Sequence, residues 1–231
     1  MAWGWHSQKD SAPISAIAIK SFDGHNTHVG IVYRIDDETD NVRILHLAFH
    51  CRLLPEDYSI ASGDYLILVP NLPSSVLEAV ASRCRITAKS NPILKYGFLV
   101  QKDARIDGEG HYFVNDERGE NCSSFVLMLF RSIGVTLINE GSWPSRVDDE
   151  FRYRQLWCML LNYVRERYSN LPDVRKVHED FVKKIAPDVT AIRIRPEETA
   201  GSCLSESFPV EFAECERHGL GILARLFPNR V

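Results

Sequence analysis

One cysteine stands where a nucleophile could work. Cys122 follows a polar, glycine-bearing segment and begins the run CSSFVLMLFRSIGV, whose pattern predicts an apolar helix that ends near Gly134. The first turn of a helix offers unpaired backbone N–H groups and the positive end of the helix dipole, which favour a thiolate and can stabilise an oxyanion. The small polar neighbours Asn121 and Ser123 are expected to keep this helix start open. Cys122 is therefore the predicted nucleophile.

Two histidines occupy strand-like segments earlier in the chain. His28 begins HVGIVYRI and His46 lies within RILHLAFH, and both runs alternate in the manner of β-strands. The acidic segment DDETDN between them predicts a hairpin, so both imidazoles could face a helix laid across the paired strands. We predict His28 as the base that serves Cys122. His50 shares the face of His46 and could compete with it, but its place near the strand end predicts a surface position.

The elements around these residues predict an α+β fold. Strands are expected at 14–19 and 64–70, a Pro/Asp/Ser loop follows His50, a helix covers the stretch after Leu72, and 101–120 is expected to be a surface loop. We expect a catalytic unit at 1–145 and a mostly helical extension at 146–231. The extension is expected to contain two long helices, one short β-like run (TAIRIR) and a final helix.

Composition and charge exclude some classes of function. The 231 residues are 45% apolar with a net charge of −4, which suits one folded core and provides no basic stripe for nucleic acid. The chain shows neither an export signal nor a transmembrane segment, so we expect a cytoplasmic product, or one secreted by a signal-independent route. Its six cysteines lack paired spacing and are expected to be mostly buried thiols, although Cys203 and Cys215 are close enough in sequence to be bridged.

A metal site is not expected. His25, His28 and His46 could gather around an ion, but no cysteine or carboxylate completes the set at a characteristic spacing. We therefore expect neither a metal nor another cofactor.

The segments HVGIVY, ILHLAF and ENCSSFV resemble the permuted branch of the papain-like NlpC superfamily, which includes lecithin:retinol acyltransferase-like proteins and is related to cell-wall peptidases. The resemblance covers roughly residues 14–135 and includes the chain order, with the histidine strand before the cysteine helix. It implies a permuted papain-like fold, an antiparallel sheet packed against the Cys-bearing helix. It also implies Cys122 as nucleophile, His28 as general base and His46 as the group that orients His28. Tyr96, in YGF, resembles the tyrosine that lines such sites, and with Asn121 and Ser123 it forms the expected substrate-binding set.

The resemblance implies hydrolysis of an amide bond through a Cys122 acyl-enzyme. A peptide or peptidoglycan-like substrate is expected, cleaved by a cell-wall amidase or endopeptidase, or by a delivered toxin or effector with an immunity or delivery protein as partner. One alternative is a lipid acyltransferase, phospholipase or thioesterase that uses the same residues. That alternative predicts an apolar channel beside Cys122, and the two serines after Asn-Cys speak against it. Another alternative is a binding module that keeps this fold without turnover.

Overall fold

A computed structural model describes residues 13–22, 26–36, 41–58, 65–186 and 192–228. Its centre is an antiparallel sheet of five strands in the order β4-β3-β2-β1-β5. The strands are β1 (Ser15–Ser21), β2 (Thr27–Arg34), β3 (Val42–Phe49), β4 (Arg52–Asp57) and β5 (Leu66–Leu68). The predicted α+β class and the predicted pairing of the two histidine strands are both confirmed.

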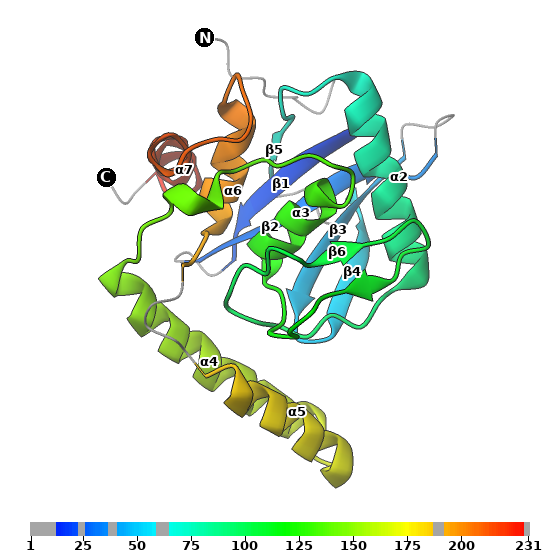
Figure 1. Cartoon of the computed structure of the whole chain (residues 1–231), viewed down its shortest axis with the longest axis vertical. Helices are drawn as coiled ribbons and strands as arrows, with labels where there is room; N and C mark the ends of the chain where they lie inside the picture. The colour runs from blue at the N-terminus through cyan, green and yellow to red at the C-terminus, as the bar shows by residue number, and fades with distance from the viewer. Residues whose placement is uncertain (1–12, 23–25, 37–40, 59–64, 187–191, 229–231) are drawn as a thin grey trace.

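Two helices cover one face of this sheet. The helices α2 (Ser74–Ser90) and α3 (Cys122–Arg131) pack against strand residues such as Val29, Ile31 and Leu45. Figure 1 shows α3 lying across the middle of the sheet with α2 beside it. Strand residues on the opposite face, including Val32 and Ile44, form a second and smaller apolar cluster. Because alternate strand residues point to opposite faces, this division fixes which side each strand side chain occupies.

β4 lies where the sequence predicted a loop. Cys51 adopts a left-handed backbone with φ of 53°, which lets the chain reverse within two residues of β3 and pair with it. Pro55 cannot donate a hydrogen bond, but β4 is an edge strand, where one side of the backbone needs no partner. The loop prediction for this segment was therefore wrong, because a proline in an edge strand resembles a proline in a loop.

The segment expected to be a surface loop also contains a small sheet. The strands β6 (Arg105–Ile106) and β7 (Tyr112–Phe113) pair antiparallel, and Gln101 and Glu120 nearby are buried. The polar composition of residues 101–120 favoured the loop prediction. These polar side chains can be buried because Gln101 donates hydrogen bonds to the Glu120 carboxylate and to the Gly119 carbonyl.

The remaining helices are α4 (Val147–Arg167), α5 (Pro172–Lys184), α6 (Pro196–Gly201) and α7 (Phe212–Leu226), with short 3-10 turns at Glu140–Ser142 and Ser202–Leu204. The two long helices and the final helix are confirmed. The β-like run is not: its first two residues, 190 and 191, lie outside the described residues, residues 192–195 form no strand, and Pro196 begins α6. α4 and α5 run side by side below the sheet, and α6 packs on β1, β2 and α3 (Figure 1).

The core joins residues from both sides of residue 145. Ala200, Val210 and Ile222 belong to the same buried cluster as the sheet and α3. Within the described part of the chain, no helix is long and apolar enough to cross a membrane.

Candidate active site

The start of α3 is fixed by a reciprocal pair of hydrogen bonds. The Asn121 side-chain oxygen accepts from the Ser124 N–H at 2.9 Å, and the Ser124 hydroxyl accepts from the Asn121 N–H at 2.9 Å. This capping box satisfies two donors near the end of the helix and places Cys122 as its first residue. The prediction that Cys122 begins a helix is confirmed. Asn121, predicted to bind substrate, serves here as the helix cap.

The Cys122 thiol is nearly covered. Its residue is 8% exposed, and the following Ser123 and Ser124 are buried as well, so the expectation of an open helix start was wrong. Burial raises the pKa of the thiol, although the backbone N–H of Val29 and the nearby positive charge of Arg193 act in the opposite direction. The helix dipole was expected to favour a thiolate. The net effect is the reverse, because burial holds the pKa of the thiol above its ordinary value.

His28 and His46 form a direct hydrogen bond. Nε2 of His28 and Nδ1 of His46 are 2.7 Å apart, and Nε2 of His46 lies 3.4 Å from a carboxylate oxygen of Glu56 on β4. A carboxylate beside Nε2 favours the tautomer of His46 that carries its proton there, which leaves Nδ1 of His46 as an acceptor. Nε2 of His28 must then donate. Nδ1 of His28 is therefore left with a lone pair, as a general base requires.

Both histidines are held neutral. Burial lowers the pKa of His28 to about 3, with further contributions from His46 and Lys20. Burial also lowers the pKa of His46, although Glu56 opposes that change. The raised pKa of the thiol and the lowered pKa values of both imidazoles disfavour a resting thiolate–imidazolium pair. Proton transfer must accompany attack on a substrate.

The Cys122 thiol contacts the backbone of β2, the strand that carries His28. The Val29 N–H that donates toward the sulfur belongs to the peptide bond that joins His28 to Val29. Described pairing between β2 and β3 ends at Ile31 and Leu45, so this end of β2 lies beyond the ladder with β3. Within the described residues, no hydrogen bond joins the sulfur to either imidazole.

The two imidazoles do not share the face that α3 covers. His28 and His46 lie on the side of Val32 and Ile44, and a Cβ built on Gly30 between them would approach the His46 Cβ to 2.8 Å. The expectation that both imidazoles face the helix was therefore wrong. The Cys122 sulfur contacts β2 through the backbone N–H of Val29, whereas the His28 ring lies on the other face of the sheet.

Two tyrosines lie near the thiol. The predicted residue Tyr96 is buried and packs its ring on Phe49 and Phe98, and Cys122 contributes to raising its pKa. Tyr65 was not singled out from the sequence. Its hydroxyl is buried and has no hydrogen-bond partner among the described residues, and its pKa is raised by burial, Glu56 and Cys122. No spacing rule could have found Tyr65, because its position depends on the order of β5 and β1 in the sheet.

Glu56 was also missed. It faces Ile44 across the β3–β4 ladder and so shares the side of the sheet on which His46 lies. The loop prediction for residues 52–57 hid this carboxylate, because a residue in a loop has no defined face. Once β4 is placed beside β3, strand alternation alone puts Glu56 near His46.

His50 corrects a further expectation. It is 0% exposed instead of lying at the surface, and its Nε2 is 2.9 Å from Nδ1 of His178 on α5. The ligand atoms of His50, Cys51 and His178 lie within 4.8 Å of one another, a grouping that could hold a metal ion. The hydrogen bonds oppose this, because the Tyr96 N–H donates to Nδ1 of His50 and leaves the proton on Nε2. The nitrogen that would bind the ion is thus already a donor to His178.

His25 lies outside the described residues, so the grouping of His25, His28 and His46 is not described. All six cysteines are free thiols. Cys203 and Cys215 are both buried, and Cys215 contributes to raising the pKa of Cys203.

No family model matches the chain, and neither the curated proteins nor the solved structures contain a match.

Proposed function

We propose that this chain is a cysteine-dependent hydrolase that cleaves an amide bond through a thioester on Cys122. The observation that carries the proposal is the hydrogen bond between His46 and His28, with the Glu56 carboxylate 3.4 Å from Nε2 of His46. This arrangement leaves a lone pair on Nδ1 of His28, and the backbone N–H of the next residue, Val29, reaches the Cys122 sulfur. A buried thiol with only a structural role has no need of such a relay.

The reaction follows from these groups. Nδ1 of His28 accepts the thiol proton while the sulfur attacks the amide carbonyl, and backbone N–H groups at the start of α3 stabilise the oxyanion. The C–N bond then breaks, and the imidazolium returns its proton to the leaving amine. Water, deprotonated by His28, hydrolyses the thioester and restores the thiol. His46 and Glu56 hold the His28 ring in the tautomer that each step needs.

Substrate binding has to bring the His28 ring and the sulfur together. Catalytic hydrogen bonds are often long or poorly aligned until substrate is bound, so their absence here does not oppose the role of His28. Val29, whose backbone N–H contacts the sulfur, immediately follows His28, but strand alternation puts the His28 ring on the opposite face, so the ring has to turn around this end of β2.

The proposal includes the fold family implied by the sequence. The confirmed antiparallel sheet, the helix that begins at Cys122 and the order of histidine strands before cysteine helix support a permuted papain-like fold of the NlpC type. A peptide or peptidoglycan-like amide is the substrate class this resemblance favours. Action as a delivered toxin or effector belongs to the same proposal.

Product analysis tests the reaction class. Purified protein is incubated with peptidoglycan stem peptides and, separately, with phospholipid vesicles, and products are identified by mass spectrometry. We expect peptide cleavage that is lost in Cys122→Ala and kept in the control Cys158→Ala, which changes an exposed cysteine on α4. Fatty acid release without peptide cleavage would favour the lipid alternative instead. The absence of any turnover of either substrate would leave the binding-module reading as the better one.

A further inference from the structure

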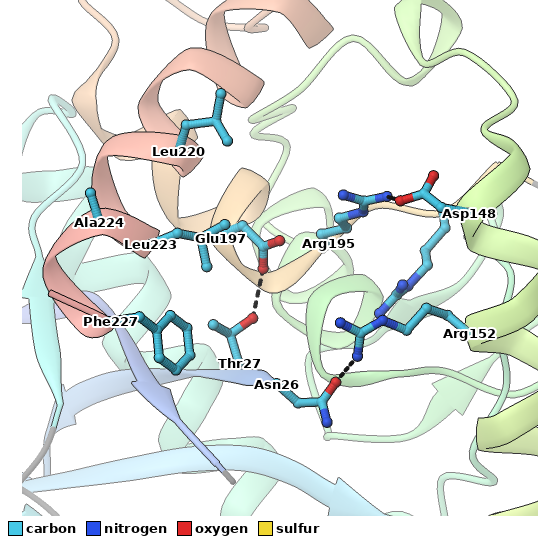
Figure 2. Close-up of a pocket in the computed structure, with 11 residues that line it drawn as sticks. Asn26, Thr27, Asp148, Arg152, Arg195, Glu197, Leu220, Leu223, Ala224 and Phe227 are labelled. Carbon is cyan, nitrogen blue, oxygen red and sulfur yellow. Dashed lines mark hydrogen bonds and ion pairs between the residues drawn. The ribbon is translucent and has the colours of Figure 1, made fainter. Parts of the chain in front are cut away.

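A cavity of about 360 Å³ lies at the end of β2, beside α4, α6 and α7. Figure 2 shows its two unlike walls. Apolar side chains of α7 and the residue after it line one side, among them Leu220, Leu223 and Phe227. Guanidinium groups line the other side, namely those of Arg152, Arg193 and Arg195.

The three arginines are not equally engaged. Arg195 pairs with Asp148 and Asp149, and Arg193 also pairs with Asp149. Arg152 instead donates to the side-chain oxygen of Asn26, and it forms no ion pair within the described residues. Arg152 is therefore the cation most available to a ligand.

The ion pairs of the lining leave Arg152 for one anionic group of a ligand. Asp148 and Asp149 pair with Arg195, and Asp149 also pairs with Arg193. Glu197 is further engaged, because it accepts a hydrogen bond from the Thr27 hydroxyl at 2.6 Å. A guanidinium group binds a carboxylate through two parallel hydrogen bonds, and the adjoining apolar wall would favour a ligand with a hydrocarbon group beside its charge.

The cavity adjoins the candidate active site. Thr27, in its lining, directly precedes His28, and α6, which supplies Glu197, packs on both β2 and α3. Arg193, also in the lining, is close enough to lower the pKa of the Cys122 thiol. A substrate held in the cavity would therefore extend toward the sulfur.

We propose that this cavity is a substrate subsite that binds a peptide segment in which a carboxylate stands beside an apolar side chain, with Arg152 as the main anion-binding group. The inference rests on the proposed function and names the substrate feature that the hydrolase recognises. The carboxylate can be a free peptide C-terminus or an acidic side chain, since both present the same group.

Binding to the inactive Cys122→Ala protein tests the subsite apart from catalysis. Calorimetry compares three probes: N-acetyl-leucyl-leucine, its C-terminal amide, and N-acetyl-leucyl-glutamate capped as the C-terminal amide. We expect at least one carboxylate probe to bind about ten-fold more tightly than the neutral amide, which is the effect expected of a charge-assisted hydrogen-bond pair. The first and third probes distinguish a terminal from a side-chain carboxylate.

Two variants and a matched control complete the test. Arg152→Gln should remove the ten-fold preference, whereas Arg154→Gln, two residues further along α4 and paired with Glu150, should keep it. Leu223→Asn should weaken the leucine probes and leave N-acetyl-glycyl-glycine unchanged. Equal binding of the carboxylate and amide probes, or an equal effect of the two arginine variants, would overturn the subsite. Octanoate binding more tightly than every peptide probe would overturn the peptide assignment. Because no turnover is measured, a failure here is distinguishable from a failure of the hydrolase proposal.

Discussion

The proton positions around His28 depend on a carboxylate that contacts His46, the hydrogen-bond partner of His28, at 3.4 Å. Glu56 sets the tautomer of His46, and His46 then sets the tautomer of His28. If this relay were absent, neither imidazole would favour the form that leaves Nδ1 of His28 free to accept a proton. Glu56 is thus a positioning residue, since it acts on the thiol only through the two histidines.

Removing Glu56 should lower turnover without unfolding the protein. We expect Glu56→Ala to reduce kcat/KM by about ten-fold, because the carboxylate that favours a proton on Nε2 of His46 is lost. Glu56→Gln should recover most of that loss, because an amide oxygen can still face the N–H at Nε2 of His46. Asp57→Ala is the matched control, since Asp57 neighbours Glu56 and pairs with Arg43 at the surface. A glutamine variant as slow as the alanine variant would contradict the tautomer argument.

Tyr65 offers a test in which activity and stability change in opposite directions. Its hydroxyl is buried without a partner among the described residues, which costs folding free energy, and it lies near the thiol. Tyr65→Phe should therefore raise the unfolding free energy by about 1 kcal/mol. If the hydroxyl stabilises the oxyanion, the same change should lower kcat by about 100-fold. Urea denaturation and steady-state kinetics check both; a less stable but fully active variant would show that Tyr65 has only a structural role.

At the scale of the elements, two groups should make stability depend on pH in opposite directions. His50 at the end of β3 joins α5 through His178, and Glu120 lies buried just before α3. The fold lowers the pKa of His50 and raises the pKa of Glu120. His50 therefore reduces the stability of the folded state at low pH, and Glu120 reduces it at high pH.

The His50 contact should weaken in acid. The unfolded chain protonates this histidine below pH 6.5, whereas burial and the charges of His178 and Lys95 lower its folded pKa to about 3. Between these values the unfolded state binds more protons, so the unfolding free energy should fall as the pH falls, by up to about 1.4 kcal/mol per pH unit. Urea denaturation between pH 7.5 and 4.5 should show a smaller slope for His50→Gln than for the parent. Identical slopes would mean that His50 is protonated in the folded state.

Glu120 should have the opposite effect. Its residue is 1% exposed, and burial raises its pKa from 4.5 to about 7 despite hydrogen bonds from Gln101 and Tyr112. The folded state therefore binds the extra proton between these values, and stability is lost as the pH rises through about 7. At pH 8 we expect Glu120→Gln to be more stable than the parent by about 2 to 3 kcal/mol, and at pH 4.5 the difference should vanish. A difference that does not change with pH would contradict a buried, titrating Glu120.

Some of these elements could be predicted from the sequence and others could not. The hairpin of β2 and β3 and the helix that begins at Cys122 were predictable, because their patterns are local and their turn and cap residues are typical. β4 was not predictable, since Pro55 argues against a strand unless its edge position is known. The orientation of His28 and His46 away from α3 was also not predicted. Alternation shows which residues share a face, but only packing shows which face the helix covers.

At the scale of the whole molecule, the features that would give the site its specificity come from distant parts of the chain. The cavity joins the end of β2 to α4, α6 and α7, and Tyr65 reaches the site from the position just before β5. Sequence spacing cannot indicate such groupings, because they depend on how separate elements pack. The proposed nucleophile and its proposed base lie in two local motifs that the sequence could indicate, whereas Glu56, Tyr65 and the arginine-lined cavity required the fold.

The most direct test of Cys122 as nucleophile compares two kinds of electrophile. Iodoacetamide should modify the exposed Cys158 faster than the buried, neutral thiol of Cys122. A peptidyl vinyl sulfone, which occupies a substrate site, should reverse that order and modify Cys122 first, as located by peptide mass spectrometry. His28→Ala should abolish the reversal and leave the iodoacetamide reaction of Cys158 unchanged. If the vinyl sulfone also modifies Cys158 first, or if His28→Ala has no effect on the rate at Cys122, then Cys122 is not the nucleophile of a histidine-assisted hydrolase.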